Sequence, residues 1–526
     1  MKRLLSLLAA ILALAALPAA APASPTQESM FQDDPLLVYA APERVGRTLD
    51  RLAQLGVDRI RVSLFWRIIA PANDQAQKPA FDATDPAAYP AEHWERYDRL
   101  IRAAQARGIG VNLNFTSPIP RWAAGESPRA DLQETFGPNP EEFGNFVRAV
   151  ARRYDGTYMG LPRVDFWSIW NEPNQAGWLT PQWSSDPRNS NQMIESAPMV
   201  YRRLVANAWT ALADTGHGND TILVGETAPQ GQKRLRDISQ SIDALRFLRQ
   251  LYCLDDNLNL LTGTNAEVRG CPVGNPSQFV AENPGLFHAS GYAHHPYAQL
   301  TPPGRKSSWP DWVSMSDLRA LSRELTRIYQ RYGQQMPSKR GVPLYLTEYG
   351  YQTKPDPFFA AVSFARQAAW LNQAEYISFK NPNVRSMSQF LLVDDGPAAG
   401  FDAKKEARLA WRTFQSGLVF ANGKRKLSYR AYVTPLFVKQ RTVRRGRTVG
   451  IFGMLRSAKA GTLQTVRIQF RVKGRKRWRT LRTRKVGGAR HFFETRVRVR
   501  ASGDLRLLWK DGSRLRVSRT DSITAR

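Results

Sequence analysis

The sequence contains few residues of the kinds that build metal centres. Its 526 residues include two cysteines and six histidines. A structural zinc site needs four such ligands, and two cysteines with scattered histidines do not supply them. No glycine-rich phosphate loop follows the first predicted strand either, which argues against a dinucleotide-binding fold. We therefore predict neither a metal nor another cofactor.

Long apolar runs are also missing after the first residues of the chain. Lys2 and Arg3 precede an apolar run over residues 4–17, and the small residues Ala-Pro-Ala follow at 21–23. This pattern is typical of a secretory signal peptide over residues 1–23, and an uncleaved membrane anchor is the alternative. No later segment approaches 18 uninterrupted apolar residues, so we expect no transmembrane segment once the signal is removed. The protein is therefore predicted to be secreted, extracellular or associated with the cell surface.

The two cysteines, Cys253 and Cys271, lie close together in the sequence. In the oxidising compartment that export implies, such a pair is expected to form a disulfide. The bridge would stabilise the fold by about 3 kcal/mol in the chain-entropy model. Two unrelated reduced thiols are the alternative. We interpret the bridge as a brace on an inserted loop rather than as a reactive site.

Acidic residues are scarce in the last part of the chain. Residues 431–526 contain 27 Lys and Arg but 4 Asp and Glu, and they carry most of the net charge of +30. Apolar and polar positions alternate there, as in residues 465–472 and 495–500, and glycines separate the short runs. Such alternation with glycine turns predicts a small antiparallel β-sandwich over residues 436–526. The boundary is expected near residues 428–442.

The larger part of the chain, residues 30–433, alternates apolar runs with amphipathic helical stretches. Alternation of strand and helix indicates an α/β fold with a parallel sheet and right-handed crossovers. Eight such units fit a closed (β/α)8 barrel, or TIM barrel. An open, doubly wound sheet is the structural alternative. The eight predicted strands are residues 35–40, 59–66, 109–115, 164–170, 221–224, 287–295, 344–348 and 384–393.

Two glutamates stand where apolar strands end. Glu172 follows the fourth predicted strand, and Glu348 ends the seventh. A carboxylate next to a buried run costs free energy because it must be partly desolvated, so this placement is expected where chemistry requires it. Reactive residues of a (β/α)8 barrel lie at the carboxyl ends of its strands. We therefore expect both carboxylates to converge on one site, which is the minimum equipment for cleaving a glycosidic bond.

The segment around Glu172 reads Trp170-Asn171-Glu172-Pro173-Asn174. It resembles the acid/base signature of clan A retaining glycoside hydrolases, a (β/α)8 superfamily that includes the cellulase-like family 5 and the xylosidase-like family 39. The resemblance implies that Glu172 is the acid/base, that Glu348 is the nucleophile, and that Asn171 binds the sugar 2-hydroxyl. Retaining enzymes hold the two carboxyl groups about 5 Å apart, and inverting enzymes hold them at roughly twice that separation.

Further site residues follow from the same resemblance. Arg61 matches the second-strand arginine that pairs with the nucleophile, and an arginine that points outward from the strand is the alternative. His295 and Tyr297 close the sixth strand, where the superfamily often places groups near the nucleophile. Neighbours on a strand point to opposite faces, so His294 and His295 are not expected to share a metal.

Aromatic side chains are expected to stack on the sugar. Trp66 and Trp122 are predicted to do so, although a single tryptophan is more often part of the core. They are chosen from five tryptophans at or after predicted strand ends: Trp66, Trp122, Trp170, Trp178 and Trp183. The eighth strand departs from the superfamily, because residues 387–390, Met-Ser-Gln-Phe, lack the tryptophan that many members carry. Gln389 could supply a polar contact to the substrate instead.

The resemblance implies a secreted retaining β-glycoside hydrolase that cleaves O-glycosidic bonds of a poly- or oligosaccharide by double displacement. Two alternatives stay open: a catalytically inactive carbohydrate-binding barrel at the cell surface, and a transglycosylase that uses the same residues. The basic last domain suggests an anionic partner such as a cell-wall polymer, a polysaccharide or lipid head groups, and a solubilising strand face is the alternative. Nucleic acid is not an expected partner, because the chain is predicted to be exported.

Overall fold

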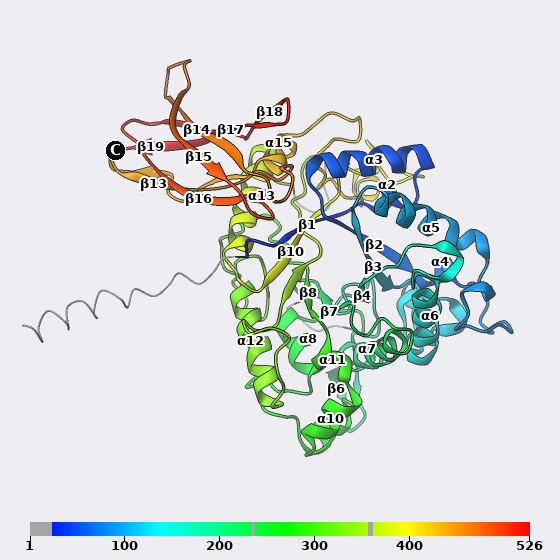
Figure 1. Cartoon of the computed structure of the whole chain (residues 1–526). Coiled ribbons are helices and arrows are strands. Elements are labelled where there is room, and N and C mark those ends of the chain that lie inside the picture. Colours follow the sequence, from blue (N-terminus) through cyan, green and yellow to red (C-terminus); the bar gives the residue numbers. More distant parts are fainter. Residues whose placement is uncertain (1–23, 233–236, 356–360) are drawn as a thin grey trace, which may run out of the picture.

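The computed structural model of the chain describes residues 24–232, 237–355 and 361–526 (Figure 1). The predicted signal peptide, residues 1–23, lies outside the described residues. A closed barrel of parallel strands occupies the first part of the chain, and mainly antiparallel sheets occupy the last part. None of the described helices is long and apolar enough to cross a membrane.

Eight parallel strands close the barrel in the order β1-β2-β3-β4-β7-β8-β9-β10, and β10 pairs with β1. This arrangement confirms the predicted (β/α)8 fold. Most side chains of these strands are buried, as expected for parallel strands that helices cover on the outside. The strands are β1 (Glu28–Gln32), β2 (Arg59–Phe65), β3 (Gly110–Thr116), β4 (Phe166–Ile169), β7 (Thr221–Thr227), β8 (Gly291–His294), β9 (Leu344–Leu346) and β10 (Val384–Phe390).

The first strand of the barrel is not the one predicted from the sequence. The predicted strand at residues 35–40 begins instead as a short helix, α2 (Asp34–Leu37), which follows β1. The carboxylate of Asp33 accepts a hydrogen bond from the backbone N–H of Leu36 and caps this helix. Pro35 lies in its first turn, where the N–H that proline lacks has no partner in any case. Capping therefore outweighs the apolar run that suggested a strand.

Amphipathic helices cover the outside of the barrel. In α3 (Pro42–Leu55), for example, Val45, Leu49 and Leu52 recur at helical spacing and are buried. This helix ends at Gly56, whose φ of 78° lies in the left-handed region that glycine adopts without strain. The other long helices are α5 (Ala91–Gln105), α6 (Pro140–Arg153), α7 (Ala197–Asp214), α12 (Leu318–Arg331) and α13 (Phe364–Phe379), and shorter ones are α4 (Trp66–Ile69), α8 (Ala244–Leu251), α14 (Ala407–Ala410) and α15 (Leu427–Val433).

Inserted segments lengthen two of the loops. A hairpin of β5 (Trp183–Asp186) and β6 (Asn189–Glu195) follows β4, and short helices precede β8. Cys253 and Cys271 form a disulfide in the second insertion, which confirms the predicted pairing. The bridge ties the end of α8 to the loop after α9, so it braces an insertion outside the barrel strands. The short helices are α9 (Gly263–Glu267), α10 (Pro276–Glu282) and α11 (Pro284–His288).

The last domain contains two packed sheets, as its alternating pattern predicted. One sheet has the order β11-β13-β16, and the other has the order β12-β19-β17-β14-β15 with β18 paired to β17. Side chains such as Ile468 and Leu507 form the core between the sheets. The strands are β11 (Leu436–Val438), β12 (Thr442–Val443), β13 (Thr448–Met454), β14 (Gln464–Val472), β15 (Arg479–Val486), β16 (Phe492–Arg498), β17 (Gly503–Asp511), β18 (Arg514–Val517) and β19 (Asp521–Ala525).

The sandwich packs against the amino-terminal end of the barrel strands. Arg456, in the loop after β13, donates to Ser29 at the start of β1 and forms a 2.6 Å ion pair with Glu375 of α13. Arg490 pairs with Asp58, which directly precedes β2. In Figure 1 the sandwich, in orange and red, extends away from the barrel beside β1 and α13. These contacts place it at the end opposite to the carboxyl ends of the strands.

Replacing Arg456 with methionine is expected to lower the free energy of unfolding by about 3–5 kcal/mol, because the buried carboxylate of Glu375 loses its cation. The side chains of Arg456 and Glu375 have exposed fractions of only 2% and 7%. Urea unfolding followed by tryptophan fluorescence measures the change. Arg444→Met is the matched control, since Arg444 is exposed on the same domain. Equal losses in both variants would show that the buried pair is not the cause.

Candidate active site

Three glutamates stand at the carboxyl ends of barrel strands. Glu172 follows β4, Glu226 lies near the end of β7, and Glu348 follows β9. Glu172 and Glu226 have φ angles of 37° and 48°, in the left-handed region that residues other than glycine seldom adopt. Such conformations cost about 1–3 kcal/mol each and are concentrated at functional sites. The N–H of Glu172 also donates to the carbonyl of Glu226 at 3.0 Å, so the two strand ends are held together where the acids emerge.

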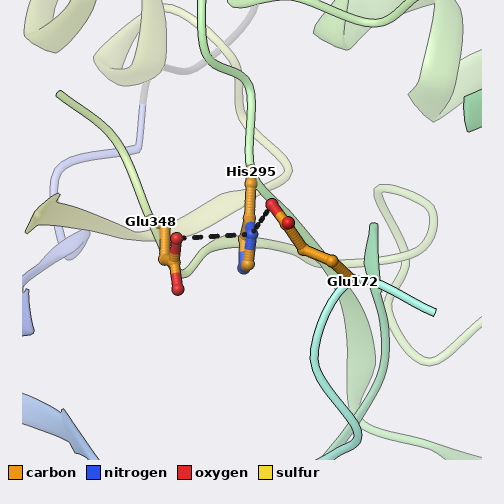
Figure 2. A group of neighbouring side chains, drawn as sticks. All are labelled: Glu172, His295 and Glu348. Atoms are coloured by element: carbon orange, nitrogen blue, oxygen red, sulfur yellow. Dashed lines mark hydrogen bonds and ion pairs between the residues drawn. The ribbon is translucent and has the colours of Figure 1, made fainter. Parts of the chain in front are cut away.

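His295 lies between the two predicted catalytic acids (Figure 2). Its Nδ1 is 2.8 Å from Oε1 of Glu172 and 3.6 Å from Oε2 of Glu348. An oxygen of Glu172, an oxygen of Glu348 and a ring nitrogen of His295 all lie within 4.8 Å of one another. Two acids from different strands thus share one small space around a single imidazole.

Arg61 of β2 is fully buried and connects four side chains of the site. Its Nη1 donates to Oε1 of Glu348 at 2.7 Å and to Oε1 of Gln32 at 2.6 Å. Its Nη2 donates to Oδ1 of Asn171 at 2.6 Å and to Oε2 of Glu226 at 3.1 Å. Burial by itself would lower the pKa of Arg61, but Glu226 and Glu348 outweigh it and raise the pKa, so the guanidinium keeps its charge. The alternative of an outward-pointing Arg61 is therefore wrong.

Tyr297 approaches the site from the loop after β8. Its hydroxyl donates to Oε2 of Glu348 at 3.0 Å. Burial and the charge of Glu348 raise the pKa of Tyr297 well above its ordinary value, so the hydroxyl keeps its proton. His294, one position before His295, makes different contacts, and its Nε2 lies 2.9 Å from the carbonyl of Val313. Burial lowers the pKa of His294 to about 4, so this imidazole is neutral.

His295, by contrast, carries a positive charge at neutral pH. Its Nδ1 contacts Glu172 and its Nε2 lies 2.8 Å from Oε2 of Glu226, so both ring nitrogens face carboxylate oxygens. Burial would lower the pKa of His295, but the charge of Glu348 and the hydrogen bonds with Glu172 and Glu226 outweigh it and raise the pKa to about 9. An imidazolium has no lone pair for a metal. Glu172, His295 and Glu348 present three potential ligand atoms in one place, and the doubly protonated imidazole offers no lone pair in this protonation state.

Glu226 is a site residue that the sequence-based prediction missed. Its side chain is fully buried, and its Oε2 accepts hydrogen bonds from Arg61, His295 and Thr347. Burial alone would raise the pKa of Glu226, but the charge of Arg61 and the hydrogen bond with His295 outweigh it and lower the pKa to about 2. The sequence offered a way to find Glu226, because it lies at the end of an apolar run, as Glu172 and Glu348 do.

A cavity of about 900 Å³ opens at the site, and Asn171, Glu172, Tyr297 and Glu348 contribute to its lining. Aromatic rings form part of the wall, and two of them, Trp178 and Phe65, stack with centroids 6.4 Å apart. Flat rings in a cavity wall suit the apolar faces of sugars. The polar lining includes several glutamines: Gln32, Gln175, Gln230, Gln232, Gln299 and Gln352.

Two tryptophans that were predicted to stack on the sugar do not line this cavity. Trp66 is fully buried and packs against Phe143, with centroids 5.6 Å apart, so its ring cannot reach a sugar. Trp122 packs edge-on against Trp66 at 6.1 Å and donates its N–H to the carbonyl of Pro71. Both rings belong to the packing between the barrel and its outer helices. Trp178 is the member of the predicted five that lines the cavity.

Gln389 of β10 does not line the cavity either. Its Nε2 donates to the carbonyl of Phe390 at 2.8 Å and to the carbonyl of Ser416 at 3.1 Å. The amide group therefore bonds the backbone rather than a substrate. The next residue, Phe390, does line the cavity. An aromatic ring therefore stands at the end of the eighth strand in place of the expected polar contact.

The chain resembles one protein family and several solved structures. The family model for cellulases of glycosyl hydrolase family 5 matches residues 26–384. Similar solved structures include a family 39 glycoside hydrolase from the gut symbiont Bacteroides cellulosilyticus WH2, with 15% identity and a TM-score of 0.48 over 90% of this chain and 81% of that one. Another is a GH5_18 protein from Streptomyces cattleya in complex with GlcNAc, with 16% identity and a TM-score of 0.46 over 78% and 79% of the two chains. No match was found among curated proteins.

The matched region covers most of the chain. It contains β1 to β9 and both of the glutamates that flank His295. The chain therefore belongs to the cellulase family, glycosyl hydrolase family 5, and is a glycosidase.

Proposed function

We propose that this glycosidase is a secreted, retaining β-glycoside hydrolase that acts on a poly- or oligosaccharide. The observation that carries the proposal is the short distance between the two acids, because oxygens of Glu172 and Glu348 lie within 4.8 Å of each other. Retaining enzymes hold these carboxyl groups about 5 Å apart, whereas inverting enzymes leave room for a water molecule. Secretion rests on the sequence of residues 1–23 alone.

In the first step, Glu348 attacks the anomeric carbon while Glu172 gives its proton to the leaving glycosidic oxygen. One C–O bond forms to Glu348 as the glycosidic C–O bond breaks, which leaves a glycosyl-enzyme ester and a free hydroxyl on the departing sugar. Arg61 and Tyr297 donate to different oxygens of Glu348 and fix its orientation. Asn171, whose Oδ1 accepts a hydrogen bond from Arg61, is the residue that we propose binds the sugar 2-hydroxyl.

In the second step, the ionised Glu172 takes a proton from a water molecule, and the water oxygen attacks the anomeric carbon. The ester bond breaks, Glu348 is released as a carboxylate, and Glu172 has regained its proton. Two inversions restore the β configuration. His295 donates to Glu172 and stabilises the carboxylate between the steps, since a hydrogen bond with two charged partners is stronger than a neutral one.

The stereochemistry of the product tests this mechanism directly. Proton NMR recorded during cleavage of β-linked gluco-, manno- and xylo-oligosaccharides should show the β-anomer first, before mutarotation mixes the two forms. An α-anomer as the first product would contradict the retaining mechanism. Longer oligosaccharides among the products would identify a transglycosylase, and no reaction on any β-linked glycan would favour the binding-barrel alternative.

We further propose that the sandwich binds an anionic polysaccharide. A groove of about 640 Å³ is lined by Arg482 and Arg484 of β15 and by Arg496 of β16. Arg482 donates to the carbonyl of Arg496 at 3.1 Å, and Arg484 donates to the carbonyl of Glu494 at 2.7 Å, so both side chains are held at the groove. The carboxylate of Glu494 pairs with Lys439 instead. The three guanidinium groups can therefore offer their charge to a ligand.

Retention on a polygalacturonate resin tests this second proposal. The triple variant Arg482→Gln, Arg484→Gln, Arg496→Gln is expected to elute at roughly half the salt concentration of the wild type, because exposed charges act through screened contacts. A matched control replaces Arg444, Arg445 and Arg447, which are exposed on the same domain but do not line the groove. Equal shifts in both triple variants, or tighter retention on DNA-cellulose, would overturn the proposal.

A further inference from the structure

Glu226 is part of the site but does not face the substrate cavity. Its side chain has no exposed surface, and it is absent from the cavity lining that includes Glu172 and Glu348. The mechanism above assigns no step to it. Even so, its Oε2 lies 2.8 Å from Nε2 of His295 and 3.1 Å from Nη2 of Arg61. A fully buried carboxylate costs free energy because it loses its hydration. Nearby positive charges must compensate for that cost.

Counting charges shows what Glu226 contributes. Arg61 and His295 are two cations, and they are in contact with three carboxyl groups, those of Glu172, Glu226 and Glu348. When Glu172 carries its transferable proton, two cations balance two carboxylates and the cluster is neutral. Without the charge of Glu226, two buried cations would share one carboxylate. The excess positive charge would then favour loss of the proton from His295.

We infer that Glu226 is a positioning residue: it keeps His295 doubly protonated and thereby fixes which oxygen of Glu172 carries the transferable proton. The inference rests on the proposed role of Glu172 as proton donor. A neutral His295 could place its one proton on Nε2, towards Glu226, and leave Nδ1 as an acceptor. Glu172 could then donate its own proton in a hydrogen bond to Nδ1, where it would not be available to the glycosidic oxygen. An imidazolium must donate from both nitrogens, which excludes that arrangement.

The geometry assigns the proton to the free oxygen of Glu172. Nδ1–H of His295 donates to Oε1 of Glu172 at 2.8 Å, so Oε1 is an acceptor in both protonation states. The proton therefore belongs on Oε2, the oxygen left for the glycosidic bond. The backbone of Glu226 supports the same alignment, because its carbonyl accepts the N–H of Glu172 at 3.0 Å.

The groups that determine the charge of His295 come from every strand end around it. Glu172 after β4, Glu226 in β7 and Glu348 after β9 stabilise the cation. His294, Arg61 and Tyr297 are the nearby groups of other kinds; His294 is neutral, and Tyr297 keeps its proton. His295 is thus charged below its pKa of about 9 and loses the charge as the pH rises through that value. Removal of the Glu226 charge should move this transition to lower pH.

Nuclear magnetic resonance of 15N-histidine measures that transition without a substrate. The chain has six histidines, and a His295→Gln variant identifies the resonance of His295. In Glu226→Gln, which keeps the shape and one acceptor oxygen but removes the charge, we expect the titration midpoint of His295 to fall by about one pH unit or more. Glu226→Asp, which restores the charge, should recover part of the shift. Thermal unfolding shows whether each variant is folded.

The pH profile of kcat/KM provides a second readout. Its upper limb reports loss of the proton of the essential acid and should move to lower pH in Glu226→Gln, because removal of a buried negative charge favours proton loss from the cluster. A purely structural role would not produce this shift. An unmoved midpoint in Glu226→Gln, or equal behaviour of Glu226→Asp and Glu226→Gln, would overturn the inference. A His295 midpoint near 6.5 in the wild type would overturn it without any variant. Because the titration needs no substrate, failure of the proposed hydrolysis would be recognised separately, by an absence of cleavage in the wild type.

Discussion

Replacing Glu348 with alanine is expected to reduce kcat by about 10⁴-fold or more on every glycan that the wild type cleaves, since one member of a catalytic unit carries most of its effect. The variant has no group that can form the glycosyl-enzyme ester, and an uncatalysed attack by water must replace it. Initial rates on the best glycan of the β-linked panel measure the loss. Glu348→Gln keeps the side-chain volume and should be equally inactive, because an amide is a poor nucleophile.

Sodium azide distinguishes a lost nucleophile from a damaged fold. In Glu348→Ala the small anion can enter the space left by the carboxylate and attack the anomeric carbon of an activated aryl β-glycoside. The expected product is an α-glycosyl azide, formed by a single inversion. Azide should have no such effect on Glu348→Gln, where the side chain still fills the space. A β-glycosyl azide from Glu348→Ala, or unchanged activity of the variant, would mean that another residue is the nucleophile.

Replacing Glu172 with alanine should produce a loss that depends on the leaving group. For a natural glycan we expect kcat/KM to fall by about 10³-fold, because general acid catalysis contributes 10²–10⁴-fold. For a dinitrophenyl β-glycoside, whose leaving group needs no proton, kcat/KM should change by less than about tenfold while the second step becomes slow. A burst of dinitrophenol followed by a slow steady state is the measurement.

The matched control for that variant is Glu282→Ala, because Glu282 is an exposed glutamate at the end of α10. It should leave both substrates unaffected. Equal losses on the natural glycan and on the dinitrophenyl glycoside in Glu172→Ala would contradict the assignment of Glu172 as proton donor. In that case the residue would serve substrate binding in general rather than proton transfer.

Much of this site could be predicted because the strand that a residue follows determines where it lies around the barrel. Any residue at the carboxyl end of a parallel strand faces the same end of the fold, so Glu172 and Glu348 could be placed together from strand counting. Arg61, near the start of β2, came from the family resemblance alone. Glu226 obeys the same rule as the other two glutamates. It was missed because the resemblance implies one acid/base and one nucleophile, and it implies no role for a third glutamate.

The incorrect predictions have local physical causes. Residues 35–37 lie in a helix and residues 38–40 in a turn, rather than in a strand, because Asp33 caps the helix, and capping depends on one side chain rather than on hydrophobic periodicity. Trp66 and Trp122 follow a strand end yet turn outward into the helical layer, where they pack against each other. A strand end predicts that a residue is near the site, but the rotation of the chain after the strand decides which way the side chain faces.

The attachment of the sandwich at the amino-terminal end of the barrel has a consequence for how the enzyme would work on a solid surface. Arg456 and Arg490 fix the two domains to each other through buried or partly buried ion pairs. A molecule immobilised through the sandwich would therefore be held at the end of the barrel opposite to its cavity. Attachment at that end would leave the mouth of the cavity, at the carboxyl ends of the strands, uncovered by the adhering domain.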